Sequence, residues 1–221
     1  MDIIRYADLK PSPWRNGGGV TRELARFPSG GSAAGDGQWD WRVSIAEINK
    51  AGAFSSFDGM ERVLTVVDGD LLFLTVDGAE HPLEKYRPFR FSGDAEAAGA
   101  LPTGDIRDLN VICRQGAFKG FTSIIELSKK RAHPVFAGQF GILLQGQATV
   151  TPGAGMGAGD GGAGGDGTGY AGTGVVGAGD AGDAETLGRY DAVVGADTET
   201  PEILGRGFLA VVSIDPVLAE G

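Results

Sequence analysis

Short apolar segments of about four to eight residues recur along most of the chain, separated by Gly, Asp, Asn or Pro. No window of about a dozen residues keeps the apolar repeat of 3.6 that an amphipathic helix requires. Residues 41–48, WRVSIAEI, alternate with the period of two that is typical of a strand. Asp68-Gly69 and Asp77-Gly78 separate further apolar alternations, and Asp-Gly in this setting favours a hairpin. The pattern therefore predicts an all-β protein.

The predicted strands fall into two groups of similar spacing. The first ends with the segment LNVICR, and the second runs from FTSIIELS through FGILLQGQATVTP and LGRYDAVVGA to GRGFLAVVSIDP. Similar strand spacing in both halves predicts two related barrel or sandwich units packed in one globule. We place the N-terminal unit at residues 1–115 and the C-terminal unit at residues 116–221.

Residues 152–188 interrupt the second unit with a Gly-rich segment of low complexity. Such a composition cannot bury enough apolar surface to offset the entropy of ordering, so we predict a flexible insertion between two strands. Gly157, Gly159 and Gly162 fit G-x-G-x-x-G, but no predicted strand precedes them and no helix follows. Residues 161–169 fit one copy of a calcium-binding repeat, which cannot stack into a roll alone. We therefore expect no dinucleotide cofactor and keep calcium only as an alternative.

The charge and the cysteine content restrict the classes of binding partner and the cellular compartment that we expect. Nineteen basic and 29 acidic residues give a formal charge of −10, which repels nucleic acid and anionic lipid. The densest basic run, Lys129, Lys130 and Arg131, fits a solvated turn. The lone Cys113 excludes an internal disulfide, and the first residues lack the pattern of a signal peptide. We expect a cytoplasmic protein without nucleic-acid or membrane partners.

The residues needed for metal binding or acid–base chemistry are scarce. His81 and His133 are each followed by Pro near a predicted turn, and neither belongs to a metal-binding motif. We expect both to be surface turn residues, and we expect no metal and no cofactor. Cys113 lies in an alternating apolar stretch, which favours a core thiol over a nucleophile. No catalytic residue is assigned.

A few polar residues lie among apolar ones in the predicted strands. In residues 41–48 the period of two separates Val43 and Ile45 from Arg42 and Ser44. Arg42 and Ser44 either line an enclosed cavity or face solvent, and periodicity leaves both open. An enclosed Arg42 needs a carboxylate from the protein or from a ligand. Arg62 and Asn110, at predicted strand ends, would suit a small acidic metabolite or simply cap loops.

Five blocks of the sequence resemble the HutD/Ves family, which is associated with bacterial histidine utilisation. They are PWRNGGGVTREL, WDWRVSIAEI, GAFSSFDGMERVLTVVDGD, FRFSGD and RDLNVICR, in the order and spacing of the family, over roughly residues 8–118. The resemblance implies a cupin-type double β-barrel, a bicupin, without the usual cupin metal ligands. It also implies a small-molecule binder or regulator of histidine breakdown, with a ligand such as N-formimino-glutamate or urocanate.

The resemblance supplies the candidate ligand-binding residues. The positions matching the family blocks are Asn16, Thr21, Arg22, Arg42, Ser44, Arg62, Asp94 and Asn110. The Gly-rich insertion departs from the family pattern, so the resemblance does not determine the shape of the second barrel or the dimer surface. Because cupins commonly pair, the resemblance also suggests a homodimer.

The glycine run Gly17 to Gly19 has two interpretations. Glycines adopt positive φ and allow close approach of backbone, so the run can bend the N-terminal segment over a barrel mouth and deliver Asn16, Thr21 and Arg22 to a pocket. Alternatively it makes a tight crossover with Trp14 packed into the core beneath it. The two are compatible.

The sequence thus predicts a metal-independent protein that binds a carboxylate-bearing histidine-degradation intermediate and modulates histidine utilisation. The alternative is a metal-independent cupin enzyme, an isomerase or hydrolase, with Glu47 or Asp94 as base. Whether the chain is an enzyme stays open, and the shortage of His and Cys favours a binding protein. A third interpretation, a partner-binding module, rests on the insertion.

Overall fold

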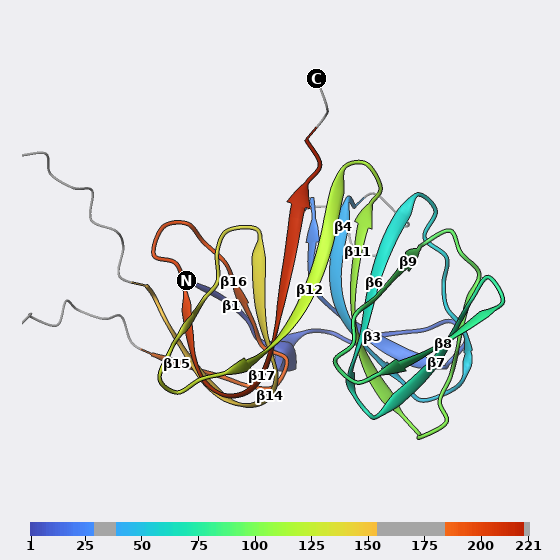
Figure 1. The fold of residues 1–221 in the computed structure, drawn as a ribbon, viewed down its shortest axis with the longest axis horizontal. Helices are drawn as coiled ribbons and strands as arrows, with labels where there is room; N and C mark the ends of the chain where they lie inside the picture. Colours follow the sequence, from blue (N-terminus) through green and yellow to red (C-terminus); the bar gives the residue numbers. More distant parts are fainter. Residues whose placement is uncertain (29–38, 154–183, 219–221) are drawn as a thin grey trace, which may run out of the picture.

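The structure, a computed structural model, describes residues 1–28, 39–153 and 184–218. Apart from one short 3-10 helix, Tyr6–Asp8, all regular elements of these residues are β-strands, which confirms the predicted all-β class. The strands form three antiparallel sheets arranged in two lobes (Figure 1). No helix in the described ranges is long and apolar enough to cross a membrane.

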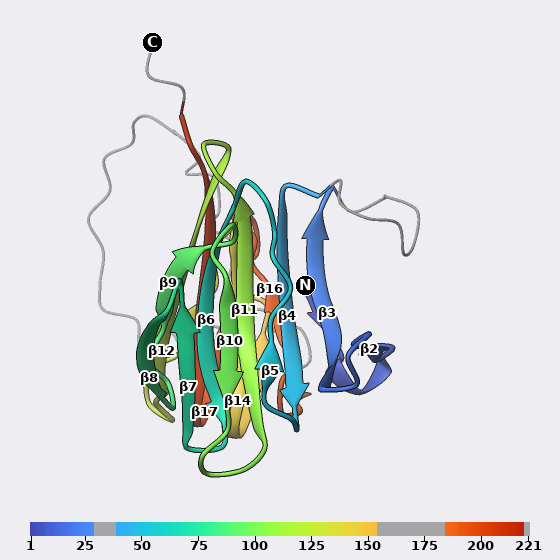
Figure 2. The ribbon, with the colours of Figure 1, turned by 90° about the vertical axis from the view of Figure 1, so that its right-hand side faces the viewer.

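The first lobe contains a six-stranded and a four-stranded sheet. The six-stranded sheet has the order β2 (Ser12–Pro13), β3 (Gly19–Phe27), β4 (Trp41–Ile48), β11 (Ile106–Arg114), β6 (Met60–Asp68) and β9 (Phe89–Ser92). Figure 2 shows this order from β9 at one edge to β3 and β2 at the other. The four-stranded sheet has the order β5 (Gly52–Ala53), β10 (Ala97–Ala100), β7 (Leu71–Val76) and β8 (Ala79–Glu84).

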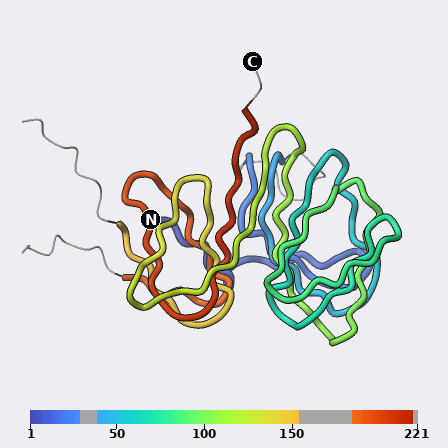
Figure 3. Tube along the Cα trace, in the orientation of Figure 1, coloured from blue at the N-terminus to red at the C-terminus, as the bar shows by residue number. Residues whose placement is uncertain are grey.

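The second lobe is built on a seven-stranded sheet. Its main path is β1 (Asp2–Ile4), β16 (Ala192–Val194), β14 (Gln139–Thr151), β17 (Glu202–Pro216) and β12 (Phe118–Leu127), with β13 (His133–Pro134) on β17 and β15 (Glu185–Leu187) on β14. Because β1 pairs with β16, the first residues of the chain lie in the lobe formed by its C-terminal half (Figure 3).

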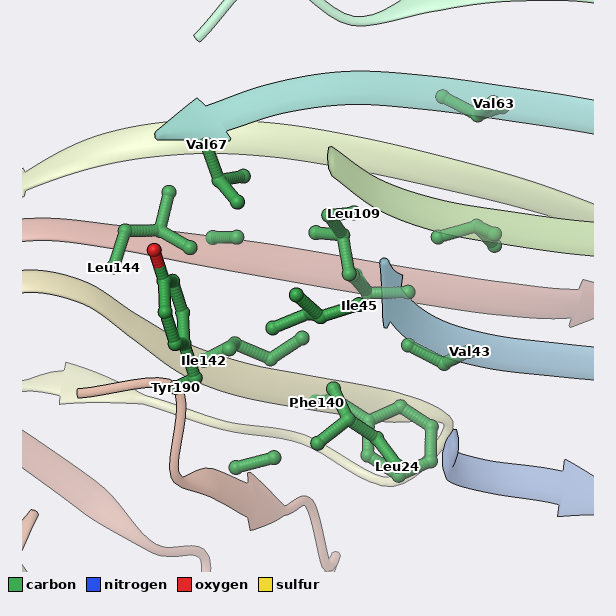
Figure 4. Packing of buried hydrophobic residues seen from close by; sticks show 14 of the residues in the cluster. Leu24, Val43, Ile45, Val63, Val67, Leu109, Phe140, Ile142, Leu144 and Tyr190 are labelled. Atoms are coloured by element: carbon green, nitrogen blue, oxygen red, sulfur yellow. The ribbon is translucent and has the colours of Figure 1, made fainter. Parts of the chain in front are cut away.

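The core between the lobes covers one face of the six-stranded sheet. Val43, Ile45 and Leu109 from this sheet pack against Ile142 and Leu144 of the seven-stranded sheet (Figure 4). A second cluster, which includes Leu64, Leu72 and Leu74, fills the space between the six- and four-stranded sheets. The central strands β4, β6 and β11 are therefore covered on both faces, in keeping with their nearly continuous burial.

The two Asp-Gly pairs behave differently. Asp77, at φ 48°, and Gly78, at φ 81°, turn β7 back onto β8, which confirms a hairpin there. The hairpin prediction at Asp68-Gly69 is wrong, because the turn carries the chain from the six-stranded sheet to the four-stranded sheet. Strand β6 pairs with β11 on one edge and, over Glu61–Leu64, with β9 on the other, whereas β7 pairs with β10 and β8.

Three further predictions can be compared with the structure. Cys113 is a core thiol as predicted, and burial raises its pKa to about 12. His81 and His133 were expected in turns, but they lie in strands β8 and β13. The edge position of β8 explains this, because an edge strand tolerates the proline that follows His81. Most of the predicted insertion lies outside the described residues, whereas its last part, Glu185–Leu187, forms β15.

The glycine run closes the tight β2–β3 connection. The backbone N–H of Gly17, at φ 66°, donates to the Trp14 carbonyl at 3.0 Å, and that of Trp14 donates to the Gly19 carbonyl at 2.9 Å. A Cβ at Gly19 would overlap the backbone carbonyl oxygen of Glu47 on β4. Gly17 thus provides the positive φ and Gly19 the close approach of strands.

We predict that Gly19→Ala lowers the free energy of unfolding by about 1–3 kcal/mol, because β3 must move away from β4 to admit the new methyl group. Gly18→Ala is the matched control, since its Cβ would meet only the flexible side chain of Asn16, at 3.3 Å, and ordinary contacts. Urea unfolding of both variants measures the difference. Equal losses would show that the close approach at Gly19 does not constrain the sheet.

Candidate functional site

A cavity of about 1070 Å³ lies in the first lobe, on the face of the six-stranded sheet that points away from the second lobe. Side chains from β3, β4, β6 and β11 form its floor, and residues 10–16 and 53–58 contribute to its walls. The alternation of β4 explains the placement, because Val43 and Ile45 point into the core between the lobes while Arg42 and Ser44 point into the cavity.

Most of the candidate residues come together here. The cavity lining includes Asn16, Thr21, Arg42, Ser44, Arg62 and Asn110. Arg22 and Asp94 do not line it. Arg22 lies on the opposite face of β3, paired with Glu47, and Asp94 caps a turn by accepting a hydrogen bond from the Gly59 N–H at 2.8 Å.

Arg62 is the most enclosed cation of the cavity and is 4% exposed. Its Nη2 donates to Oδ1 of Asn110 at 2.9 Å. The guanidinium also lies over the rings of Phe54, Phe57 and Phe91, with the ring of Phe91 at 4.9 Å. Burial lowers its pKa to about 10, so the group stays charged at neutral pH although its solvation is largely lost.

Asp108 is a cavity residue that sequence reasoning missed. Its Oδ1 accepts a hydrogen bond from Nδ2 of Asn110 at 2.8 Å, and the residue is only 1% exposed. Burial raises the pKa of this carboxyl to about 6, against the opposing effects of Arg62 and Asn110. The signal was present, because the period of two in β11 places Asp108 on the same face as Asn110.

Arg42 contrasts with Arg62 in its partners. Its guanidinium lies 4.8 Å from the ring centre of Trp39 and 5.2 Å from that of Phe57. Within the described residues we find no hydrogen bond or ion pair for it, and its Nε is buried without a partner. Burial lowers the pKa of Arg42, and the nearby Glu23 only partly opposes this. The structure thus answers the open question about Arg42, which faces a cavity rather than bulk solvent.

The cavity is rich in positive charge although the chain as a whole carries −10. Its basic lining residues are Lys10, Arg15, Arg26, Arg42, Arg62 and Arg114, and its acidic ones are Glu23, Asp58 and Asp108. Such an excess of cations in a concave site favours an anionic ligand. The described residues contain no group of three or more His, Cys, Asp or Glu that could hold a metal ion.

The two bases suggested for an enzyme lie outside this cavity. Glu47 faces the side of the second lobe, where Arg107 and Arg22 overcome the effect of burial and keep its pKa below the usual value. Asp94 is exposed and also accepts a hydrogen bond from the Ser92 hydroxyl at 3.1 Å. Both placements correct the expectation that one of them could serve as base, because neither reaches the cavity arginines.

The structure supports both interpretations of the glycine run in part, because Asn16 and Thr21 line the cavity whereas Arg22 lies on the opposite face of β3. The Trp14 ring packs edge-on against Phe54 in the first lobe, and its Nε1 donates to the hydroxyl of Thr21 at 2.8 Å. Asn16 accepts a hydrogen bond from the Gly18 N–H at 3.0 Å and also lines the cavity. The crossover therefore anchors Trp14 and at the same time brings Asn16 and Thr21 to the cavity wall.

The fold is shared with proteins of known structure. A conserved protein of unknown function from Pseudomonas aeruginosa PAO1 matches with a TM-score of 0.71 at 25% identity, and HutD from Pseudomonas fluorescens SBW25 with 0.68 at 27%. Each comparison covers 97% of this chain and 98% of the other. A cupin 2 conserved barrel domain protein from Leptotrichia buccalis matches over 96% of this chain and 95% of its own, with a TM-score of 0.53 at 8% identity, which shows a cupin-like fold.

Relatives are also found by sequence. The chain is 42% identical over 113 residues to an uncharacterized 21.2 kDa protein in the hutC 3' region of Pseudomonas putida, which is 51% of this chain and 57% of that protein. It is 39% identical over 121 residues to protein Ves of Citrobacter koseri, 52% of this chain and 61% of that protein. The matches thus span about three fifths of these curated relatives.

The HutD family model matches residues 6–210, which is nearly the whole chain. This match confirms the resemblance seen in the five sequence blocks, and the cavity is formed largely by residues of those blocks. The chain belongs to the HutD family.

Proposed function

We propose that this protein binds a small carboxylate-bearing metabolite in the cavity of the first lobe, without a metal. The observation that supports this most directly is Arg42, a partly desolvated guanidinium that has no hydrogen bond or ion pair among the described residues and that the nearby Glu23 only partly compensates. A guanidinium removed from water is costly unless an anion compensates it. A ligand carboxylate would supply that anion through two parallel N–H···O bonds.

The rest of the cavity suits the same class of ligand. Arg62 adds a second fixed positive charge, while Ser44 and Thr21 offer hydroxyl groups at the wall. The rings of Trp39 and Phe57 provide an apolar surface for the body of the ligand. Membership of the HutD family makes an intermediate of histidine degradation, such as N-formimino-glutamate or urocanate, the first candidate, and modulation of histidine utilisation the associated role.

We also propose that the two lobes are two related cupin barrels, residues 1–115 and 116–221, the second interrupted by the Gly-rich segment. The two separate apolar interiors, one between the six- and four-stranded sheets and one within the seven-stranded sheet, support this division. A homodimer stays a proposal from the cupin resemblance.

A second candidate function is a metal-independent enzyme acting on such a metabolite. The specific observation in its favour is Asp108, a carboxyl in the cavity whose pKa is raised by burial to about 6. A carboxyl with this pKa exchanges protons near neutral pH and can act as a general base.

For the binding function we predict that a pathway carboxylate raises the midpoint of thermal unfolding. A ligand at one hundred times its dissociation constant adds about 2.7 kcal/mol to the stability of the folded state. The panel contains formate, glutamate, urocanate, N-formimino-glutamate and EDTA; formate is included because HutD from Pseudomonas fluorescens was solved in a formate condition. The response is expected to be lost in Arg42→Ala and kept in Arg131→Ala, which removes an exposed arginine. Identical responses of wild type and Arg42→Ala would contradict the proposal.

A second prediction separates the two arginines by their effect on stability. Arg42→Met should stabilise the ligand-free protein by about 1 kcal/mol, because it removes a desolvated charge without a partner. Arg62→Met should destabilise it by about 3 kcal/mol or more, because Asp108 and Asn110 lose their cation.

The pH dependence of the Arg62→Met loss follows from Asp108. The folded-state pKa of Asp108 lies above its unfolded value, so its ionised form destabilises the fold as pH rises through about 6. Removing Arg62 raises that pKa further, so the loss should be largest above pH 6 and smaller in acid. Chemical denaturation at acid and neutral pH tests this, and losses of equal size in both methionine variants would contradict it.

For the enzyme alternative we predict turnover of one pathway intermediate that Asp108→Asn abolishes while binding is retained. Proton NMR of each intermediate incubated with wild type and with the variant would show conversion directly. No conversion of any intermediate by the wild type would exclude this alternative for the compounds tested.

A further inference from the structure

Three side chains of the cavity floor form a hydrogen-bonded series. Asp108 Oδ1 accepts from Asn110 Nδ2 at 2.8 Å, and Asn110 Oδ1 accepts from Arg62 Nη2 at 2.9 Å. The two bonds fix the Asn110 amide, since only its nitrogen can donate to the carboxylate and only its oxygen can accept from the guanidinium. Asp108 is therefore linked through Asn110 to the guanidinium of Arg62, which also donates to the Ser55 carbonyl at 3.4 Å.

The second oxygen of Asp108 has no such role. Oδ2 is buried and has no hydrogen-bond partner within the described residues. A proton can therefore be added at Oδ2 without breaking either hydrogen bond of the series. The pKa of about 6 that burial gives this carboxyl means that the proton is available from solvent near neutral pH.

The charges around Asp108 come from several elements. Arg62 on β6 is its cationic neighbour in the cavity floor, whereas Arg42 on β4 lies opposite Ile112, four residues further along β11. Strand β3 contributes Glu23 and Arg26 to the same cavity. The remaining charged lining residues are Lys10, Arg15, Asp58 and Arg114. Arg114 is paired with Asp40 at 2.6 Å, and Arg26 with Glu23 at 3.4 Å. Of the three acidic lining groups, Asp108 is the buried one, at 1% exposed.

We propose that Asp108 is a positioning residue of the anion site and takes up one proton when a carboxylate binds beside Arg62 and Arg42. This inference rests on the proposed binding function and adds the way in which it depends on pH. The proton comes from solvent and forms an O–H bond at Oδ2, so the charge of Asp108 changes from −1 to 0. The ligand carboxylate replaces that charge beside Arg62 and supplies an anion to Arg42.

The direction of the effect follows from electrostatics. A bound anion near Asp108 disfavours its ionised form and so raises its affinity for a proton. By reciprocity, protonation of Asp108 raises the affinity of the site for the anion by the same factor. Carboxylate affinity should therefore increase as pH falls from about 8 to about 6, by at most tenfold per pH unit for one proton, and level off in stronger acid.

The experiment is calorimetric titration with sodium formate and with sodium glutamate at about pH 7.5 and about pH 5.5, where their carboxylates stay ionised. Each titration is repeated in two buffers of different ionisation enthalpy, which gives the number of protons taken up. For the wild type we expect uptake of a measurable fraction of one proton at pH 7.5 and affinity at least threefold tighter at pH 5.5.

Two variants assign the proton. Asp108→Asn imitates the protonated side chain, so it should bind more tightly than the wild type at pH 7.5, without proton uptake and without dependence on pH. Asp58→Asn is the matched control, because Asp58 is an exposed carboxyl of the same cavity and its loss should leave the proton uptake unchanged. If Asp108→Asn does not fold, carbon-13 NMR of the aspartate carboxyls in the wild type, with and without formate, follows the same proton.

The outcomes separate the two proposals. Carboxylate binding with no proton uptake and equal affinity at both pH values overturns the role of Asp108 and leaves the binding function standing. Loss of the proton uptake in Asp58→Asn also overturns the role of Asp108, because the proton would then bind to Asp58. Failure of every carboxylate to bind at either pH overturns the binding function and the role of Asp108 with it.

Discussion

Two apolar layers cover the six-stranded sheet, one on each face, and this double burial determines what the first lobe can do. In a sheet with a solvated face, a polar side chain on every second residue requires no partner. Here much of the second face is also covered, so the polar side chains buried on it, such as Arg62 and Asp108, need partners within the lobe or from a ligand. The cavity is the part of this enclosed face where polar residues replace apolar ones.

Arg62 and Arg42 differ in how their positive charges are compensated in the cavity. Arg62 has protein partners, since it donates to Asn110 and lies over three phenylalanine rings. Arg42 shares one of those rings, Phe57, and has the ring of Trp39, but no acceptor among the described residues. Aromatic faces offset only part of the desolvation of a guanidinium. This difference in partners is the reason why the proposed binding function assigns the anion to Arg42 rather than to Arg62.

Much of the fold and part of the site could be predicted from the sequence. The alternation in WRVSIAEI correctly separated Val43 and Ile45 from Arg42 and Ser44, because a strand has a fixed period of two. The same period shows why Thr21 and Arg22 could not both belong to one cavity, since neighbours in a strand point to opposite faces. It could not show that both faces of β4 are covered, because this depends on how the two lobes pack together. The hairpin at Asp68-Gly69 failed for a similar reason, since the pairing of β6 is decided by distant strands.

Arg22 and Glu47, which the sequence suggested for the site, lie instead in an ion-pair cluster on the other face of the six-stranded sheet. Arg22 on β3, Glu47 on β4 and Arg107 on β11 form ion pairs across three adjacent strands, on the face opposite the cavity. These three strands also carry Thr21, Ser44 and Asn110 to the cavity. Because a shift of one residue in register would move every side chain to the other face, interactions that hold the register on one face also fix the polar residues on the other. Arg22 therefore helps to align the strands that carry the cavity residues, although it does not line the cavity itself.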